Sequence, residues 1–195
     1  MKKPLAGIIN LSTNNILSIK RALEFVGFNT LLINENTEVT KFDLIVLPGV
    51  GAFNEAMSTL NNTNLIKTID KTLNKNKKFL GICLGMQLLF QESNEFIKTK
   101  GIGFFDGKVK NFKDFPIYKK TFIGWNKVNF EKKFFKSDKQ FSLLQNKSYY
   151  FVHSFFVNCK NKNIEYGNSK NGKLTYASVV KKDNVTAFQF HPEKS

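Results

Sequence analysis

The chain has 195 residues, of which 42% are hydrophobic and 23% are charged, and this composition is typical of a globular protein with one domain or two small ones. No apolar run is long enough to cross a membrane. The net charge of +15 suggests nucleic-acid binding, but Arg21 is the only arginine among the 30 basic residues. Because arginine is preferred for bidentate phosphate and base recognition, the lysines are interpreted as solvated surface, and no nucleic-acid partner is expected.

Cysteine usage and the amino end bear on the cellular compartment. Cys83 and Cys159 are the only cysteines, which is too few for a disulfide framework, and they do not form a metal-type pair. Residues 1–5 contain two lysines, but the following apolar run breaks at Asn10 without a small-residue cleavage site. These features predict a cytoplasmic protein that has no membrane partner.

The first half of the chain alternates apolar runs with amphipathic segments. Gly27 is expected to end the first helix, and residues 11–15 form a polar loop before it. We expect strands over 5–10, 30–33, 43–47 and 79–82, and helices over 16–26, 52–60 and 65–73. This strand–helix–strand order predicts parallel strands joined by helical crossovers.

From Gly101 onward the sequence is rich in β formers. We expect a hairpin turn over 168–172 and strands over 103–112, 122–130, 149–157, 174–180 and 185–190. Together the two halves predict one α/β domain over 1–195. Its open, mostly parallel twisted sheet would be flanked by helices and followed by a strand-rich C-terminal half.

Cys83 lies between an apolar run, 79–82, and a segment, 84–90, whose apolar residues have helical spacing. Gly81 and Gly85 flank it, as in a nucleophile elbow, where a strained turn exposes the nucleophile. The helix N-terminus would favour the thiolate, and the N–H of Leu84 would point at an oxyanion. On these residues alone, a buried cysteine that packs as a small hydrophobe is an equal alternative.

The chain has two histidines, His153 and His191, and each lies at or near the end of an apolar strand. The carboxyl ends of parallel strands gather ligand sites, so these residues and Cys83 are expected to share one sheet edge. A lone strand histidine is more often structural. However, Glu193 lies two residues after His191, so Cys83, His191 and Glu193 supply a nucleophile, a base and an orienting carboxylate.

Several motifs together are similar to one enzyme family. Gly-Ile-Cys-Leu-Gly-Met-Gln (81–87) and His-Pro-Glu (191–193) resemble the class I (triad) glutamine amidotransferases. The resemblance narrows to the glutaminase subunits of imidazole glycerol phosphate synthases through Leu-Pro-Gly-Val-Gly-Ala-Phe (47–53), Gly-Trp-Asn (124–126), Tyr-Phe-Val-His-Ser (150–154) and Phe-His-Pro-Glu-Lys-Ser (190–195). It runs over nearly the whole chain and implies a flavodoxin-like three-layer fold.

The resemblance also implies a reaction. Cys83 would attack the side-chain amide of L-glutamine, His191 would pass the thiol proton to the leaving ammonia, and Glu193 would orient His191. Water would then release glutamate from the thioester. Backbone N–H groups of Gly51 and Leu84 would form the oxyanion hole, and the glycine-rich loop 49–51 is expected to switch it on when a partner binds.

The substrate site implied by the resemblance has five members, and neither a metal nor an organic cofactor is expected. These residues are Gly49, Gln87, His153, Ser154 and Phe155. The expected partner is a (β/α)₈ cyclase subunit, which would form a heterodimer with the chain and receive the ammonia for histidine biosynthesis.

Three departures from the family pattern leave the partner open. Residues 121–123 read Thr-Phe-Ile where the family usually has Pro-His-Met, and the sequence stops at Ser195 without the usual terminal helix. The third departure is at residues 10–15. Residues 10–15 read Asn-Leu-Ser-Thr-Asn-Asn and keep only the last asparagine of the usual motif. The alternative is a paralogous glutaminase subunit that supplies ammonia to a sugar amidotransferase in surface-polysaccharide or flagellar-glycan synthesis. A catalytically silent regulatory subunit is a third possibility, but it would need a broken triad.

Overall fold

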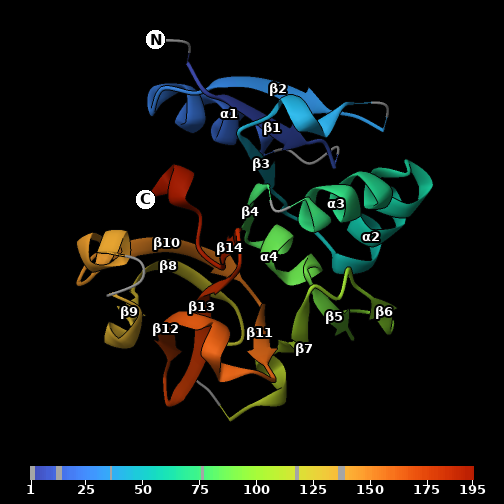
Figure 1. The fold of residues 1–195 in the computed structure, drawn as a ribbon. Helices are drawn as coiled ribbons and strands as arrows, with labels where there is room; N and C mark the ends of the chain where they lie inside the picture. Colours follow the sequence, from blue (N-terminus) through green and yellow to red (C-terminus); the bar gives the residue numbers. More distant parts are fainter. Residues whose placement is uncertain (1–2, 12–14, 36, 76, 117–118, 136–138) are drawn as a thin grey trace.

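An eight-stranded sheet, in the order β2-β1-β3-β4-β14-β13-β12-β9, organises the fold (Figure 1). The computed structural model describes residues 3–11, 15–35, 37–75, 77–116, 119–135 and 139–195. The parallel strands are β1 (Leu5–Ile9), β2 (Asn29–Ile33), β3 (Leu44–Leu47), β4 (Lys78–Ile82) and β14 (Val185–Phe188). The antiparallel extension is β13 (Leu174–Lys182), β12 (Glu165–Asn171) and β9 (Asn129–Phe130). The expected α/β class with a largely parallel sheet is confirmed.

Helices cover both faces of the parallel strands. They are α1 (Ile16–Phe25), α2 (Phe53–Asn62), α3 (Leu65–Asn74) and the short α4 (Leu84–Leu88). Ile8 of β1 packs with Ile19 and Leu23 of α1, whereas the next residue, Ile9, belongs to the core cluster that contains Leu60 of α2. Successive side chains of a strand point to opposite faces of the sheet, so neighbouring residues of β1 pack against helices on opposite faces. Burial of each such aliphatic side chain contributes about 1.5–3 kcal/mol to the free energy of folding.

The end of α1 follows the sequence prediction. Gly27 has φ 99°, a left-handed conformation that glycine adopts without steric cost. The N–H groups of Gly27 and Phe28 donate to the carbonyls of Glu24 and Leu23, which completes a Schellman cap. The polar loop expected before α1 is described only at Leu11 and Asn15, because residues 12–14 lie outside the described residues.

The helix expected over 84–90 is wrong at its carboxyl end. α4 stops at Leu88, and Phe90 begins a strand, β5 (Phe90–Ser93), which pairs with β7 (Phe105–Asn111). Every residue from 84 to 90 is buried. A segment that is buried on all sides has no amphipathic face, so its apolar residues need not follow a helical period. The spacing of apolar residues therefore could not show where α4 ends and β5 begins.

Two strands expected in the C-terminal half are each divided. The segment 149–157 forms β10 (Ser148–His153) and β11 (Phe155–Cys159), which belong to different sheets, and Ser154 separates them. β10 pairs with β8 (Phe122–Lys127), and β11 joins β7, β5 and β6 (Thr99–Lys100). The segment 122–130 likewise divides into β8 and β9. The break at Ser154 forms a corner where the two sheets meet.

The hairpin turn expected over 168–172 lies later, at residues 172–173, because β12 continues to Asn171. The polar composition of β12 concealed this strand. Its buried Ser169 and Asn171 side chains donate hydrogen bonds to the carbonyls of Lys127 and Lys119. Polar residues that are satisfied in this way can occupy a strand without the alternating apolar pattern.

Short 3₁₀ turns complete the described chain. They are η1 (Val39–Lys41), η2 (Phe112–Asp114), η3 (Lys132–Phe134), η4 (Lys139–Leu144), η5 (Lys162–Ile164) and η6 (Pro192–Lys194). The last of them, η6, contacts both α1 and β10 and so brings the end of the chain between the two halves (Figure 1). None of the described helices is long and apolar enough to cross a membrane.

Candidate active site

Cys83 occupies a strained turn between β4 and α4. Its φ of 52° and ψ of −108° lie outside the regions that side-chain-bearing residues favour, at a cost of about 1–3 kcal/mol. Its N–H donates to the carbonyl of Phe188 at 2.7 Å, which ties the turn to β14. A Cβ on Gly85 would lie 1.8 Å from the carbonyl oxygen of Leu47. The glycine therefore permits the close backbone approach that holds this turn.

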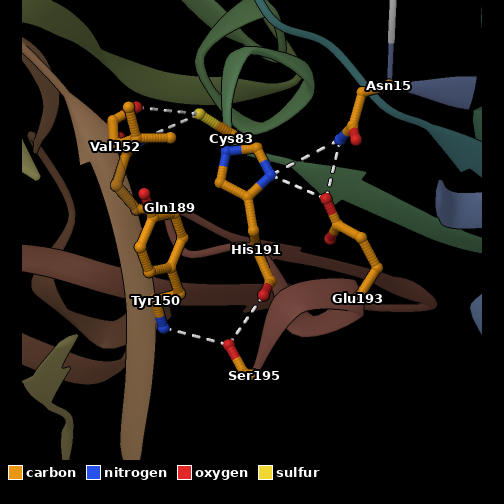
Figure 2. A network of polar contacts seen from close by, with 8 residues as sticks. All are labelled: Asn15, Cys83, Tyr150, Val152, Gln189, His191, Glu193 and Ser195. Carbon is orange, nitrogen blue, oxygen red and sulfur yellow. Dashed lines mark hydrogen bonds and ion pairs between the residues drawn. The ribbon is translucent and has the colours of Figure 1, made fainter. Parts of the chain in front are cut away.

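His191 and Glu193 follow β14 and form a buried pair beside Cys83 (Figure 2). His191 Nδ1 lies 2.8 Å from Glu193 Oε1, and both side chains are 1% exposed. Asn15 Nδ2 donates to the same carboxylate oxygen at 2.7 Å. Burial raises the pKa of Glu193, but the hydrogen bonds from His191 and Asn15 outweigh it and hold the pKa below its usual range. The carboxylate is therefore ionised beside the imidazole.

The backbone of His191 is fixed to β10. Its N–H donates to the carbonyl of Tyr150 at 2.9 Å, and its carbonyl accepts from Ser195 Oγ at 2.7 Å. The N–H of Tyr150 in turn donates to Ser195 Oγ at 3.0 Å. These bonds fix the backbone from which the imidazole side chain extends, and Figure 2 shows the two that involve Ser195.

The environment of His191 favours its protonated form. Burial lowers the pKa of the imidazole, but the Cys83 thiol and the Glu193 carboxylate outweigh burial and raise the pKa to about 9. Nε2 is buried and has no hydrogen-bond partner among the residues that the structure describes, and Figure 2 shows this edge of the ring next to Cys83. The imidazole can therefore exchange a proton through Nε2 with the Cys83 sulfur or a group beside it, while Glu193 holds Nδ1.

A cavity of about 290 Å³ opens beside Cys83. It is lined by Val50, Gly51, Cys83, Leu84, Gln87, Glu95, Thr121, Val152, His153, Ser154 and Phe155. Of the residues expected to bind substrate or an oxyanion, only Gly49 is absent from this lining. The cavity has the size of a small polar metabolite, and Cys83 lies at its wall.

Gln87 and His153 converge on one carbonyl. Gln87 Nε2 donates to the carbonyl of Phe155 at 3.0 Å, and His153 Nδ1 lies 2.8 Å from the same oxygen. Burial, partly offset by this hydrogen bond, lowers the pKa of His153 to about 4. His153 is therefore neutral at pH 7, which agrees with a positioning role and argues against a role as the base.

Three residues of this region carry no sequence motif, and the sequence analysis missed them. Glu95 supplies the one carboxylate among the described cavity-lining residues, and its Oε2 accepts from the N–H of Phe53 at 2.8 Å. Burial raises the pKa of Glu95. Asn15 contacts Glu193, and Gln189 contacts Cys83, in each case from a distant part of the chain. Only for Asn15, the one residue of 10–15 that keeps the family pattern, did the sequence contain a usable signal.

The N–H that was expected to form part of an oxyanion hole is engaged by the backbone in this structure. The N–H of Leu84, which was expected to point at an oxyanion, donates to the carbonyl of Gly49 at 3.4 Å. Gly51 has φ 113°, and a Cβ there would meet no atom within 4 Å. Gly51 therefore adopts a left-handed backbone conformation that favours glycine, and its own surroundings are open.

Within the described ranges, no group of three or more His, Cys, Asp or Glu side chains could hold a metal ion. At this site the chain brings together the thiol of Cys83, the imidazole of His191 and the carboxylate of Glu193. A thiolate paired with an imidazolium is suited to attack a carbonyl carbon and then to protonate the leaving group.

Comparisons with known proteins agree with this geometry. Residues 6–195 match the family model described as glutamine amidotransferase class-I. The subunit HisH of imidazole glycerol phosphate synthase from Methanocaldococcus jannaschii is 42% identical over 98% of this chain and 92% of its own length. The HisH subunit from Caldanaerobacter subterraneus subsp. tengcongensis is 39% identical over 98% of this chain and 91% of its own.

Solved structures show the same fold at lower identity. PurLQS from Thermotoga maritima has a chain with a TM-score of 0.78 and 19% identity, covering 98% of this chain and 89% of that one. A glutamine amidotransferase from Thermotoga maritima has a TM-score of 0.61 and 18% identity, covering 99% and 77%. The strained cysteine, the buried histidine–glutamate pair and the whole-length similarity lead to one conclusion: this chain belongs to the class I glutamine amidotransferase family.

Proposed function

We propose that this chain, as one amidotransferase domain over 1–195, is the glutaminase subunit of an imidazole glycerol phosphate synthase. It hydrolyses L-glutamine and delivers the ammonia for histidine biosynthesis in the cytoplasm. The observation that carries the proposal is the arrangement of Cys83 in a strained turn, beside the buried His191–Glu193 pair and at the wall of a cavity. The HisH relatives, 39–42% identical over nearly the whole chain, support this assignment over the sugar-amidination alternative.

The first half-reaction forms a thioester. The Cys83 thiolate attacks the side-chain carbonyl carbon of glutamine, and the C–N bond of the tetrahedral intermediate breaks. The imidazolium of His191 gives its Nε2 proton to the leaving nitrogen, which departs as ammonia. Glu193, 2.8 Å from Nδ1, keeps the ring oriented and stabilises its charge before the transfer.

The second half-reaction restores the enzyme. Neutral His191 takes a proton from water, and the resulting hydroxide attacks the thioester carbon. The C–S bond breaks, glutamate leaves, and the Cys83 thiolate is again paired with the His191 imidazolium. The raised pKa of His191, about 9, favours this ion pair at neutral pH.

The cavity lining fits an amino acid. The Glu95 carboxylate is placed to attract the α-ammonium group of glutamine. The hydroxyls of Thr121 and Ser154, 2.8 Å apart on the same wall, offer hydrogen bonds to the α-carboxylate. Gln87 holds the Phe155 carbonyl in place and so shapes the wall rather than reaching the substrate with its amide nitrogen.

The engagement of the Leu84 N–H supports control by a partner. A tetrahedral intermediate needs the N–H of Leu84, which is engaged by the carbonyl of Gly49. Rotation of the peptide group between Gly49 and Val50 would free it, and Gly49, which has no side chain, lowers the steric cost on its side of that peptide. The resting subunit is therefore slow, and the partner accelerates it by stabilising the open loop.

We place the (β/α)₈ cyclase subunit, the expected heterodimer partner, on β8. Ile123 and Trp125 expose 59% and 58% of their surface there, at alternate positions of a strand on which Trp125 pairs with Tyr150 of β10. The Trp125 ring lies 6.1 Å from that of Tyr150, and Lys194 lies 5.8 Å from the Tyr150 ring. Because the backbone of Tyr150 holds His191, a partner on this face lies next to the triad.

The deciding experiment measures glutamine hydrolysis with and without the cyclase of histidine biosynthesis and its phosphorylated nucleotide substrate. Strong stimulation is expected. If hydrolysis is not stimulated while Cys83 is still alkylated by the glutamine analogue diazo-oxonorleucine, the triad works with another partner. The sugar-amidination assignment would then replace this one.

A further inference from the structure

Gln189 is a fully buried residue that contacts the sulfur of Cys83 (Figure 2). Its Nε2 lies 3.7 Å from Cys83 Sγ, within reach of a hydrogen bond to sulfur. Its Oε1 accepts from Gln87 Nε2 at 3.1 Å. Gln189 lies just after β14 and two residues before His191, so the same segment brings both an amide and an imidazole to the sulfur.

The neighbours fix which end of the Gln189 amide faces the sulfur. The carbonyl of Phe155 can only accept, so the Gln87 atom beside it, at 3.0 Å, is the NH₂ nitrogen. That same nitrogen then donates its second proton to Gln189, whose atom at this contact must be the oxygen. The nitrogen of Gln189 is thereby directed at Cys83 Sγ, because a flipped amide would place two donors against each other.

Among the residues that the structure describes, Val152 and Gln189 are polar neighbours of the sulfur besides His191, and they favour different protonation states. The carbonyl of Val152, 3.9 Å away, can accept from a thiol S–H but offers nothing to a thiolate. The N–H of Gln189 can donate to a thiolate and strengthens as negative charge develops on the sulfur. Because Cys83 is only 6% exposed, water contributes little to stabilising that charge.

We propose that Gln189 is a further catalytic residue, whose Nε2–H group hydrogen-bonds to the Cys83 thiolate. It stabilises the nucleophile before attack, and again stabilises the departing thiolate when the thioester C–S bond breaks. The chain of bonds from Phe155 through Gln87 to Gln189 holds the donor in place from the wall of the cavity. This inference rests on the proposed glutaminase function and adds a residue to its mechanism.

The test compares the pH dependence of Cys83 alkylation by iodoacetamide, a reaction in which the thiolate displaces iodide. The alkylated Cys83 peptide is quantified by mass spectrometry, which separates it from Cys159. In Gln189→Met the side chain keeps its length but loses the donor. We expect its alkylation midpoint to move up by about one pH unit or more, and its alkylation rate at pH values below the wild-type midpoint to fall by about tenfold. Turnover of saturating glutamine with the cyclase bound should fall in parallel, with little change in KM.

Two further variants keep the result interpretable. Gln189→Asn retains an amide but withdraws it by one methylene, and it should show the same upward shift of the midpoint. Gln140→Met, at an exposed glutamine on η4, should leave the midpoint unchanged. Wild-type midpoints in both folded Gln189 variants would overturn the inference, and if the Met variant does not fold, the Asn variant decides alone. Wild-type protein that is alkylated normally but never hydrolyses glutamine would instead contradict the proposed function.

Discussion

The surroundings of His191 and of His153 make an instructive comparison. Both side chains are buried, and each has Nδ1 in a contact of 2.8 Å. Yet the pKa of His191 is raised to about 9, whereas that of His153 is lowered to about 4. His191 faces a carboxylate and a thiol, and His153 faces a backbone carbonyl. The charge of the partner, rather than the degree of burial, decides which imidazole holds a proton at neutral pH.

The aromatic cluster around His153 completes the contrast. Rings of Phe112, Phe151 and Tyr176 lie 5.1, 5.6 and 5.3 Å from the His153 ring, so the imidazole is packed as part of a core. Nε2 of His153 is buried without a hydrogen-bond partner in the described part of the chain. Burial without a counter-charge is the main cause of its lowered pKa. His191 is thus arranged for proton transfer, whereas His153 is packed as a structural side chain.

The largest loss of activity should come from removal of the Cys83 sulfur, the group with which His191 exchanges a proton. Cys83→Ala removes the nucleophile, and we expect glutamine-dependent synthesis by the complex to fall by roughly 10⁴-fold or more. Ammonia-dependent synthesis by the cyclase should be unchanged, because added ammonia bypasses the thioester. Parallel assays with glutamine and with ammonium salt provide the measurement. If both activities were lost, Cys83 would be structural and the contrast between the histidines would have no catalytic meaning.

The next effect tests the comparison directly. His191→Asn should reduce glutamine turnover by roughly 10²–10⁴-fold, the usual contribution of a positioned acid–base group. His153→Asn is the matched control, because the histidine it replaces is equally buried but neutral at pH 7. Its turnover should fall by less than about tenfold. Steady-state kinetics of both variants with the cyclase bound measure the difference, and equal losses would refute the assignment of His191 as the base.

Glu193→Gln replaces the charged partner of His191 Nδ1 by an uncharged amide oxygen, which resembles the backbone carbonyl at His153 Nδ1. With an uncharged amide oxygen at Nδ1, the pKa of His191 should fall from about 9 toward its usual range. In the proposed mechanism His191 donates its proton to the leaving ammonia, so activity should be lost as pH rises through this pKa. That alkaline limb should therefore move to lower pH in the variant. Turnover at pH 7 should fall by about 10–100-fold, less than on loss of the nucleophile.

The pH dependence of kcat supplies the measurement for Glu193→Gln. Glu92→Gln is a suitable control, since Glu92 pairs with Lys98 and Lys108 away from the cavity. Its alkaline limb should coincide with that of the wild-type enzyme. An unmoved limb in Glu193→Gln would show that the carboxylate does not set the pKa of His191.

The contrast between the histidines also shows what the sequence could predict. The structure brings Cys83, His191 and Glu193 together as the sequence predicted, because motifs at strand ends carry local information about a turn and a spacing. Asn15 and Gln189 were missed because they reach the triad only through the fold, and Asn15 lies 178 residues from Glu193. Asn15 keeps one position of the family motif and Gln189 lies two residues before His191, but neither fact reveals which atom the side chain contacts.

The fold, like the site, was predictable where local sequence carries the signal. The parallel half switches its hydrophobic period between strands and helices, so its elements were placed correctly up to α4. The C-terminal half depends on corners, such as Ser154 between β10 and β11, that interrupt a continuous apolar run without any glycine or proline. Such a break arises from sheet packing, and no local propensity encodes it.

The smallest effect on activity is expected at His153, where stability gives the clearer result. The unfolded chain binds a proton at this histidine below pH 6.5, but the folded protein does so only near pH 4. Its contribution to stability is therefore complete above pH 6.5 and is lost as pH falls toward 4, by on the order of 3 kcal/mol. His191 has the opposite sign, because its stabilisation is present at low pH and is lost as pH rises through about 9.

His153→Phe removes this group while keeping an aromatic ring of similar size. The free energy of unfolding, measured in urea at pH 7 and pH 4.5, should fall less in the variant than in the wild-type protein. Phe122→Leu, a change in the same aromatic cluster without a titratable group, should keep the wild-type acid sensitivity. An equal decrease in His153→Phe and wild type would mean that His153 is protonated in the folded state. Its pKa would then be set by something other than burial, and the contrast with His191 would fail.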